Sequence, residues 1–201
     1  KKEKNLKIRP LIHIHAKSRI RSPISRLLDP SYSLENKKLL NDLKQAKSCG
    51  WELGLHPGFN TWSSKKKILK EKQRLESALG TQITSVRQHW LKFSWESTWN
   101  CQFYAGLIND STLMFNDRYG FRNSSAIQFN SFYSPNEHKT RCCILMDSHK
   151  VLNDEIKDMF QEVKITGGVA DILFHPHTIT NSYKFFPMWN MCITLLKVLK
   201  C

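Results

Sequence analysis

Several short apolar runs of this 201-residue chain each end on a residue that could do chemistry. The residues at these ends are His56, Arg87, Asp110, Asp147 and His175, and a less regular run ends at His15. In parallel α/β folds, the ligand site lies beyond the carboxyl ends of the strands. Imidazole, guanidinium and carboxylate groups gathered there suit acid–base chemistry or metal binding. The pattern therefore predicts an enzyme built on a barrel or on an open parallel sheet.

Two of these histidines are placed for specific tasks. A Pro-Gly pair follows His56 and turns the chain sharply, which suits a metal ligand, although a hydrogen-bonded structural histidine fits the sequence equally well. His175 could act as a general acid or base, because imidazole titrates near neutral pH. His13 and His15 share one face of a possible strand and are a less specific chelating pair.

The segment 87–90 places a guanidinium, an amide, an imidazole and an indole in four consecutive residues. Such a cluster is costly to bury unless its polar groups are paired, and a surface loop with a packed tryptophan is the alternative. Asp110 is the natural partner to hold Arg87 in a bidentate pair. Arg118 and Arg122 are looser candidates for the same region.

Helical patterns separate most of the apolar runs and must position their ends. We expect helices over about 34–49, 65–79, 97–105 and 152–163, each followed by a glycine that stops it. A less regular region covers 113–140. Alternating strands and helices at this spacing argue for parallel strands joined by crossover helices.

The composition limits the class of protein. The chain has 31 basic and 17 acidic residues, for a net charge of +14, which fits either an anionic partner or lysines on solvated helix faces. We favour the second interpretation, because the basic residues are spread along the chain. The six cysteines form no CxxC pair, so buried thiols in a reducing compartment are expected, and a cytoplasmic location is favoured over a secreted one.

Targeting and nucleotide motifs are not visible in the sequence. The basic segment Lys1–Lys7 is not followed by a long apolar run, and the apolar stretch 185–196 is too short to span a bilayer. GxGxxG, P-loop, GxSxG and HExxH motifs do not occur, which argues against nucleotide binding and against α/β-hydrolase or zincin chemistry.

Five segments, in order, resemble motifs of the NodB-homology polysaccharide deacetylases, and the likeness is closest to one bacterial branch of that family. The segments are DPSYSL at 29–34, WELGLH at 51–56, RQHWLKF at 87–93, AGLINDST at 105–112 with GFR at 120–122, and LFH at 173–175. The resemblance implies an α/β fold of a distorted or incomplete (β/α) barrel type. It also implies a divalent metal ion, most simply zinc, at the strand ends.

The resemblance assigns roles to single residues by position. His56 corresponds to a metal ligand, and His175 corresponds to the general acid that protonates the leaving amine. Arg87 would orient the catalytic aspartate, and Asp110 would support the site. The residues expected to line the substrate site are His89, Trp90 and Arg122.

Two features depart from the family pattern. The aspartate-containing first strand, which carries the base and one metal ligand, does not precede the strand at 11–15, so we expect residues 1–201 to form a single deacetylase-like domain that lacks its first strand. The second metal-binding histidine is replaced by Asn60, which is a poor zinc ligand. His13, His15 or His89 could substitute for it.

Three functions remain open on the sequence. The leading one is metal-dependent hydrolysis of acetyl groups on a sugar or polysaccharide. This activity would be impaired if the aspartate-containing first strand is missing. The second is a catalytically inactive, carbohydrate-binding relative that uses exposed tryptophans to stack sugar rings. The third, which is disfavoured, is a basic nucleic-acid-binding protein, whose affinity would depend steeply on salt.

Overall fold

The structure is a computed structural model, and it describes residues 10–16, 23–29, 32–115, 120–132, 139–140, 142–145 and 153–175. The chain divides into two compact units. The first, which we call the sheet unit, comprises Arg9–Thr112 and Asn130–Thr140. The second unit contains Leu113–Phe129 and the chain from Arg141 onward. The expectation of a single domain stays a prediction.

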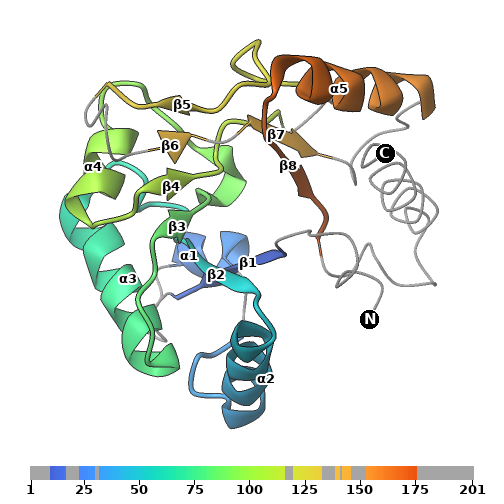
Figure 1. The fold of residues 1–201 in the computed structure, drawn as a ribbon. Coiled ribbons are helices and arrows are strands. Elements are labelled where there is room, and N and C mark those ends of the chain that lie inside the picture. The colour runs from blue at the N-terminus through green and yellow to red at the C-terminus, as the bar shows by residue number, and fades with distance from the viewer. Residues whose placement is uncertain are drawn as a thin grey trace. The chain divides into compact units, whose positions relative to one another are not determined.

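A six-stranded sheet organises the sheet unit. Its strands are β1 (Leu11–His15), β2 (Glu52–His56), β3 (Ser85–Val86), β4 (Asn109–Asp110), β5 (Phe129–Asn130) and β6 (Lys139–Thr140). They lie in the order β1-β2-β3-β4-β6-β5 (Figure 1), and the neighbours from β1 to β6 pair in parallel. The α/β class predicted from the sequence is therefore confirmed, and the described sheet does not close into a barrel.

Helices connect these strands as the alternating pattern predicts. They are α1 (Pro23–Leu28), α2 (Lys37–Ser48), α3 (Lys65–Leu79) and α4 (Thr98–Tyr104), with a short 3-10 turn at His89–Leu91. The predicted helix α3 is confirmed, and it stops at Gly80 as expected, where a φ of 66° favours glycine. The Asn36 side chain accepts the Leu39 N–H at 3.2 Å and caps α2, which is why this helix begins later than predicted.

One face of the sheet packs against the helices. Residues on this face are apolar and buried, and the register aligns Ile14, Leu55 and Val86 across three strands. Ile68 and Leu75 of α3 belong to the same core cluster and are completely buried. Successive side chains of a strand point to opposite faces of the sheet. Burial of the apolar side chains on one face therefore fixes which side chains lie on the other face, including those at the strand ends.

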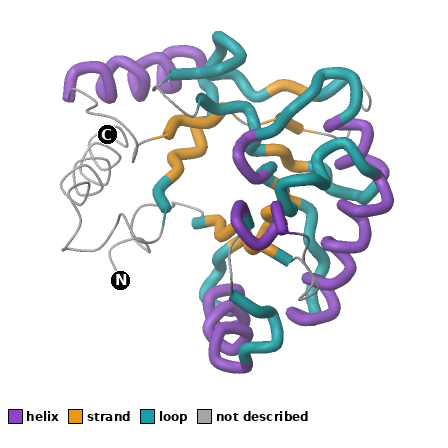
Figure 2. Tube along the Cα trace, turned by 180° about the vertical axis from the view of Figure 1, so that it is seen from behind, coloured by secondary structure: helices purple, strands orange, loops and turns teal. Residues whose placement is uncertain are grey.

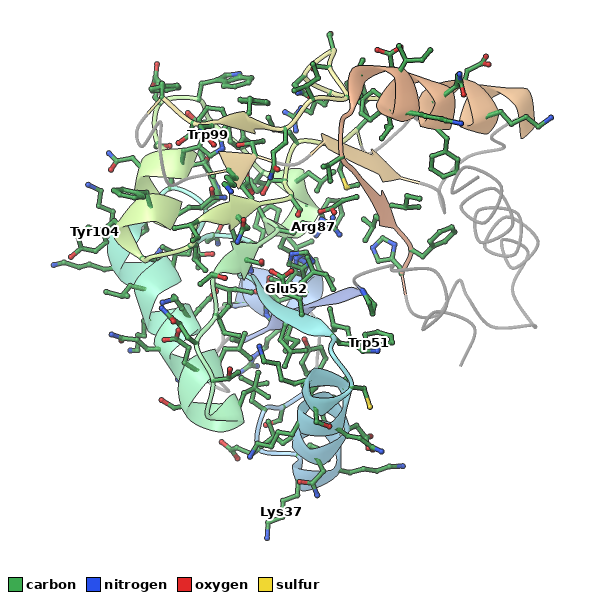
Figure 3. All side chains as sticks on the ribbon, in the orientation of Figure 1. Lys37, Trp51, Glu52, Arg87, Trp99 and Tyr104 are labelled. Carbon is green, nitrogen blue, oxygen red and sulfur yellow. The ribbon has the colours of Figure 1, made fainter. Side chains whose placement is uncertain are left out.

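The opposite face of the sheet is polar. The register places His13 beside Gly54 and His15 beside His56, so these residues share one face of β1 and β2. The imidazole of His13 lies over Gly54, where an added Cβ would come within 2.7 Å of His13 Cδ2. In Figure 3, the labelled Glu52 and Arg87 lie over the central strands, whereas Lys37 and Tyr104 project from helices.

The second unit contains a smaller strand–helix–strand motif. Strand β7 (Cys142–Leu145) pairs in parallel with β8 (Ala170–Leu173), and α5 (Asn153–Thr166) connects them. This confirms the elements predicted there, whereas Asp147 and the stretch 185–196 lie outside the described residues. Loops form much of the described chain (teal in Figure 2). No helix in the described part is both long and apolar enough to cross a membrane.

Candidate metal centre

Two histidine rings meet at the carboxyl end of the parallel sheet. His56 is the last residue of β2, and His89 begins the 3-10 turn that follows β3. The His56 Nε2 and His89 Nδ1 atoms lie 2.8 Å apart, and the two rings stand almost perpendicular at 85°. The sequence predicted that strand ends would bring such groups together, and the structure identifies His89 as the partner of His56.

The other nitrogen of each ring is occupied by a main-chain carbonyl group. His56 Nδ1 lies 2.8 Å from the Arg87 carbonyl oxygen, and His89 Nε2 lies 2.6 Å from that of Leu28. A carbonyl oxygen can only accept, so both of these nitrogens carry hydrogen. A neutral imidazole has one N–H, and therefore His56 Nε2 and His89 Nδ1 face each other as lone pairs.

Two lone pairs 2.8 Å apart repel unless a cation lies between them. The cation can be a proton, which then forms a hydrogen bond between the rings, or a metal ion bound by both. Metal-binding histidines characteristically donate their second N–H to a carbonyl or carboxylate group, as both rings do here. The two rings are therefore arranged to share one cation, either a proton or a metal ion.

Imidazole nitrogens such as His56 Nε2 and His89 Nδ1 are common zinc ligands, and the distance between these two is close to the one that zinc requires. Two Zn–N bonds of about 2.0–2.1 Å at a tetrahedral angle hold their nitrogens about 3.3 Å apart, so a shift of about 0.5 Å admits the ion. Among the described residues, no group of three or more histidine, cysteine, aspartate or glutamate side chains is arranged to hold an ion. The described part of the chain thus offers two candidate ligands, His56 and His89.

Burial keeps His56 neutral and available as a ligand. Loss of solvent, and to a smaller extent repulsion by the charged forms of His89, His15 and Arg87, together lower its pKa from 6.5 to about 3, against the opposing effect of the Arg87 carbonyl hydrogen bond. A neutral imidazole binds zinc, whereas a protonated one does not. His15, on the neighbouring strand, donates its Nδ1–H to the His56 carbonyl oxygen at 3.0 Å and helps to fix this strand end.

A buried carboxylate lies behind His89. Asp29 follows α1, its side chain is fully buried, and its Oδ1 is 3.8 Å from His89 Nε2. The same oxygen accepts the Phe59 N–H at 2.8 Å, in the turn that follows His56. Asp29 therefore contacts the surroundings of both histidines.

Trp90 forms an exposed aromatic surface next to the ring pair. Its side chain is 56% exposed, its ring centroid is 6.3 Å from that of His89, and it meets Phe59 edge to face at 6.2 Å. Trp90 and Leu91 have φ values of 57° and 49°, a conformation that costs non-glycine residues roughly 1–2 kcal/mol each. The strained turn places His89 inward and Trp90 outward.

Arg87 and Asp110, which the sequence predicted to pair, make hydrogen bonds to several other groups. Arg87 Nε donates to the Ser111 carbonyl oxygen at 2.9 Å. Asp110 accepts from the Trp99 indole and the Gln102 amide, both at 3.1 Å, and also from Thr112. These contacts hold α4 to the end of β4, and the Arg87–Asp110 pair remains a prediction.

Three further candidate residues, Asn60, Arg122 and His175, are exposed, and Arg118 lies outside the described residues. Asn60, which stands at the position of the family's second metal-binding histidine, lies in the turn after β2. Arg122 and His175 are exposed residues of the second unit, and His175 lies just beyond β8. Their predicted roles as substrate contact and general acid stay predictions.

Sequence reasoning missed two contributors to the site. Asp29 entered only through its resemblance segment, without a role, and the Leu28 carbonyl group has no sequence signal at all. Both precede His89 by about sixty residues, and only the fold brings them together.

No protein-family model matches the chain, and no curated protein matches it at a significant level.

Proposed function

We propose that the chain is a metal-dependent deacetylase that hydrolyses acetyl groups on a sugar or polysaccharide. The observation that carries the proposal is the pair of facing lone pairs on His56 Nε2 and His89 Nδ1, 2.8 Å apart at the end of a parallel sheet. Strand ends of this kind are where α/β enzymes bind ligands. In this proposal the open sheet is part of a distorted or incomplete (β/α) barrel, whose polar inner face carries the site.

Each residue of the site has a separate role in this proposal. His56 and His89 would hold the divalent ion, which when bound polarises a carbonyl group and activates water. Carbonyl groups of Arg87 and Leu28 fix the two rings, so that little reorganisation is needed when the ion binds. The resemblance assigns the role of general acid for the leaving group to His175, a role that suits an imidazole near neutral pH.

The carbohydrate part of the proposal is supported by Trp90. Its exposed indole offers an apolar face next to His89, and sugar rings present C–H groups that stack on such faces. Nearby, the Lys92 ammonium group lies 3.7 Å from the Phe59 ring centroid, which adds positive charge beside this surface. The five resembling segments point to the same substrate class.

Zinc calorimetry on point variants tests the proposal. We expect the metal-free chain to bind one zinc ion, and His56→Ala and His89→Ala to weaken binding by about 100-fold or more, because losing a ligand exceeds the effect of losing a supporting hydrogen bond. Asn60→Ala discriminates between ligands, since an exposed amide should not affect zinc affinity. A loss of zinc affinity in Asn60→Ala, with no loss in His89→Ala, would contradict the proposal that His89 is the second ligand.

Acetate release separates the enzyme from an inactive relative. We expect the zinc-loaded chain to release acetate from N-acetylated chitooligosaccharides, and His175→Ala to lose this activity while keeping its zinc affinity. Oligosaccharide binding without acetate release would instead identify a carbohydrate-binding relative, which the exposed Trp90 also favours.

A further inference from the structure

Asp29 is a buried carboxylate that the proposed chemistry does not use. Its side chain has no exposed surface, although the α1 segment before it contains exposed residues such as Leu27. An ionised carboxylate is costly to bury unless it is hydrogen-bonded or lies near positive charge. Asp29 accepts the Phe59 N–H at 2.8 Å, and its Oδ1 lies 3.8 Å from the hydrogen-bearing Nε2 of His89.

Asp29 connects the segments that hold His56 and His89. Phe59 belongs to the turn directly after His56, and the residue before Asp29 provides the carbonyl oxygen that His89 Nε2 contacts at 2.6 Å. Oxygen atoms of Leu28 and Asp29 therefore both face the Nε2 edge of His89. The Leu28 carbonyl oxygen accepts the Nε2 hydrogen, and the Asp29 charge 3.8 Å away favours the same tautomer, which leaves Nδ1 directed at His56.

The charge of Asp29 matters beyond its hydrogen bond. A divalent ion between two neutral imidazoles brings two positive charges into a largely buried region that also contains the Arg87 guanidinium. A nearby carboxylate offsets part of that charge, and outer-shell carboxylates raise the basicity of the histidine that binds the ion.

We propose that Asp29 is the positioning residue of the metal site, which orients His89 through its Nε2 edge and provides the counter-charge for the bound cation. This inference rests on the proposed function and adds a residue to its site. Asp29 touches neither the substrate nor the ion, and it acts through His89.

Glu71 provides a matched control on the same turn. It is also a buried carboxylate, and its Oε2 accepts the Gly58 N–H at 2.8 Å, one residue before the N–H that Asp29 accepts. Glu71 comes from α3 and contacts the turn on the side of the helix. The two carboxylates therefore both hold the turn, and Asp29 also lies 3.8 Å from His89 Nε2.

The experiment compares Asp29→Asn with Glu71→Gln. Each substitution keeps an oxygen that can accept the backbone N–H and removes one negative charge. Zinc affinity at pH 8 should fall about 10- to 100-fold in Asp29→Asn, the range typical of outer-shell partners, and should change little in Glu71→Gln. Thermal unfolding of each metal-free variant checks that both remain folded.

The tautomer of His89 provides a readout that a purely structural role would not move. If Asp29 orients His89 through its Nε2 edge, ¹⁵N spectra of the histidine side chains should show a smaller fraction of Nε2-protonated His89 in Asp29→Asn than in wild type, and no such change in Glu71→Gln. An unchanged His89 tautomer in Asp29→Asn, or equal losses of zinc affinity in both variants, would show that Asp29 only holds the turn and would overturn the inference.

The remaining outcomes separate this inference from the proposed function. Unchanged zinc affinity in Asp29→Asn, with zinc bound by wild type, overturns the role of Asp29 alone. A wild-type chain that binds no zinc overturns both. Zinc binding with the expected Asp29 effect, but without acetate release, supports the positioning role and overturns the deacetylase.

Discussion

The Nδ1–H of His56 donates to the main-chain carbonyl oxygen of Arg87 at 2.8 Å, so the neutral ring of His56 is held in one tautomer. The contact joins the end of β2 to the residue that follows β3, and it directs Nε2 away from the backbone. Every property that we infer for the site depends on this orientation, because it makes Nε2 a lone pair facing His89.

Burial of neutral His56 predicts a pH-dependent stability of the metal-free chain. In the folded chain the pKa is lowered from 6.5 to about 3, so below pH 6.5 the unfolded chain binds a proton that the folded chain does not. This contribution to stability is complete above pH 6.5 and is lost as the pH falls toward 3. The midpoint of urea unfolding should fall over that range more steeply in wild type than in His56→Gln. Parallel curves would contradict the assignment.

Gly54 is needed for the close approach of β1 and β2. A Cβ at this position would come within 2.7 Å of His13 Cδ2 and 3.1 Å of the Ser85 carbonyl oxygen. We expect Gly54→Ala to lower the free energy of unfolding by about 1–3 kcal/mol, as overpacking typically does, measured by urea titration. In a His13→Ala background the cost should be smaller, because the nearest atom is gone. An equal cost in both backgrounds would rule out the clash with His13.

Asp110 should stabilise the fold rather than bind zinc. Asp110→Ala leaves the buried Trp99 indole and Gln102 amide without the carboxylate that accepts their hydrogen bonds, and each unsatisfied donor costs about 1–3 kcal/mol. Urea unfolding should therefore show a loss of about 3 kcal/mol or more, and Asp110→Asn a smaller one. Reduced zinc affinity in a folded Asp110→Asn variant would instead place this residue in the site, as the resemblance implies.

Trp90 and Trp95 form a matched pair for testing carbohydrate binding. They are 56% and 55% exposed, but Trp90 lies beside His89, whereas Trp95 packs against Phe93 and Trp99. We expect Trp90→Ala to weaken the binding of a chitooligosaccharide about tenfold, which corresponds to one lost aromatic stacking contact, and Trp95→Ala to leave it unchanged. If calorimetry shows equal binding by wild type and both variants, the Trp90 surface does not bind the oligosaccharide.

The sequence predicted the helices and strands well where the spacing of apolar residues and the residues that end an element agreed. The helix Lys65–Leu79 was predicted because its apolar positions repeat at helical spacing and Gly80 stops it. The strand ending at His56 was predicted from its apolar run, and both are confirmed. The short strands β5 and β6 were not predicted, because two-residue strands in a polar region carry no periodic signal.

The site was predicted only in part, for a physical reason. The resemblance placed Asn60 at the position of the family's second metal-binding histidine and left His13, His15 and His89 as alternatives, because local patterns contain no information on contacts between distant segments. The pairing of His89 with His56 depends on the left-handed turn at Trp90, and the position of Asp29 depends on how α1 meets the sheet. Neither feature can be derived from composition or periodicity.

The most direct test is a long-range ¹H–¹⁵N spectrum of the histidine side chains, recorded before and after one equivalent of zinc is added. We predict that zinc moves the His56 Nε2 and His89 Nδ1 resonances to the metal-bound range, while His56 Nδ1 and His89 Nε2 keep their hydrogens. Binding through other nitrogens, or no change in either ring, would contradict a metal site between His56 and His89.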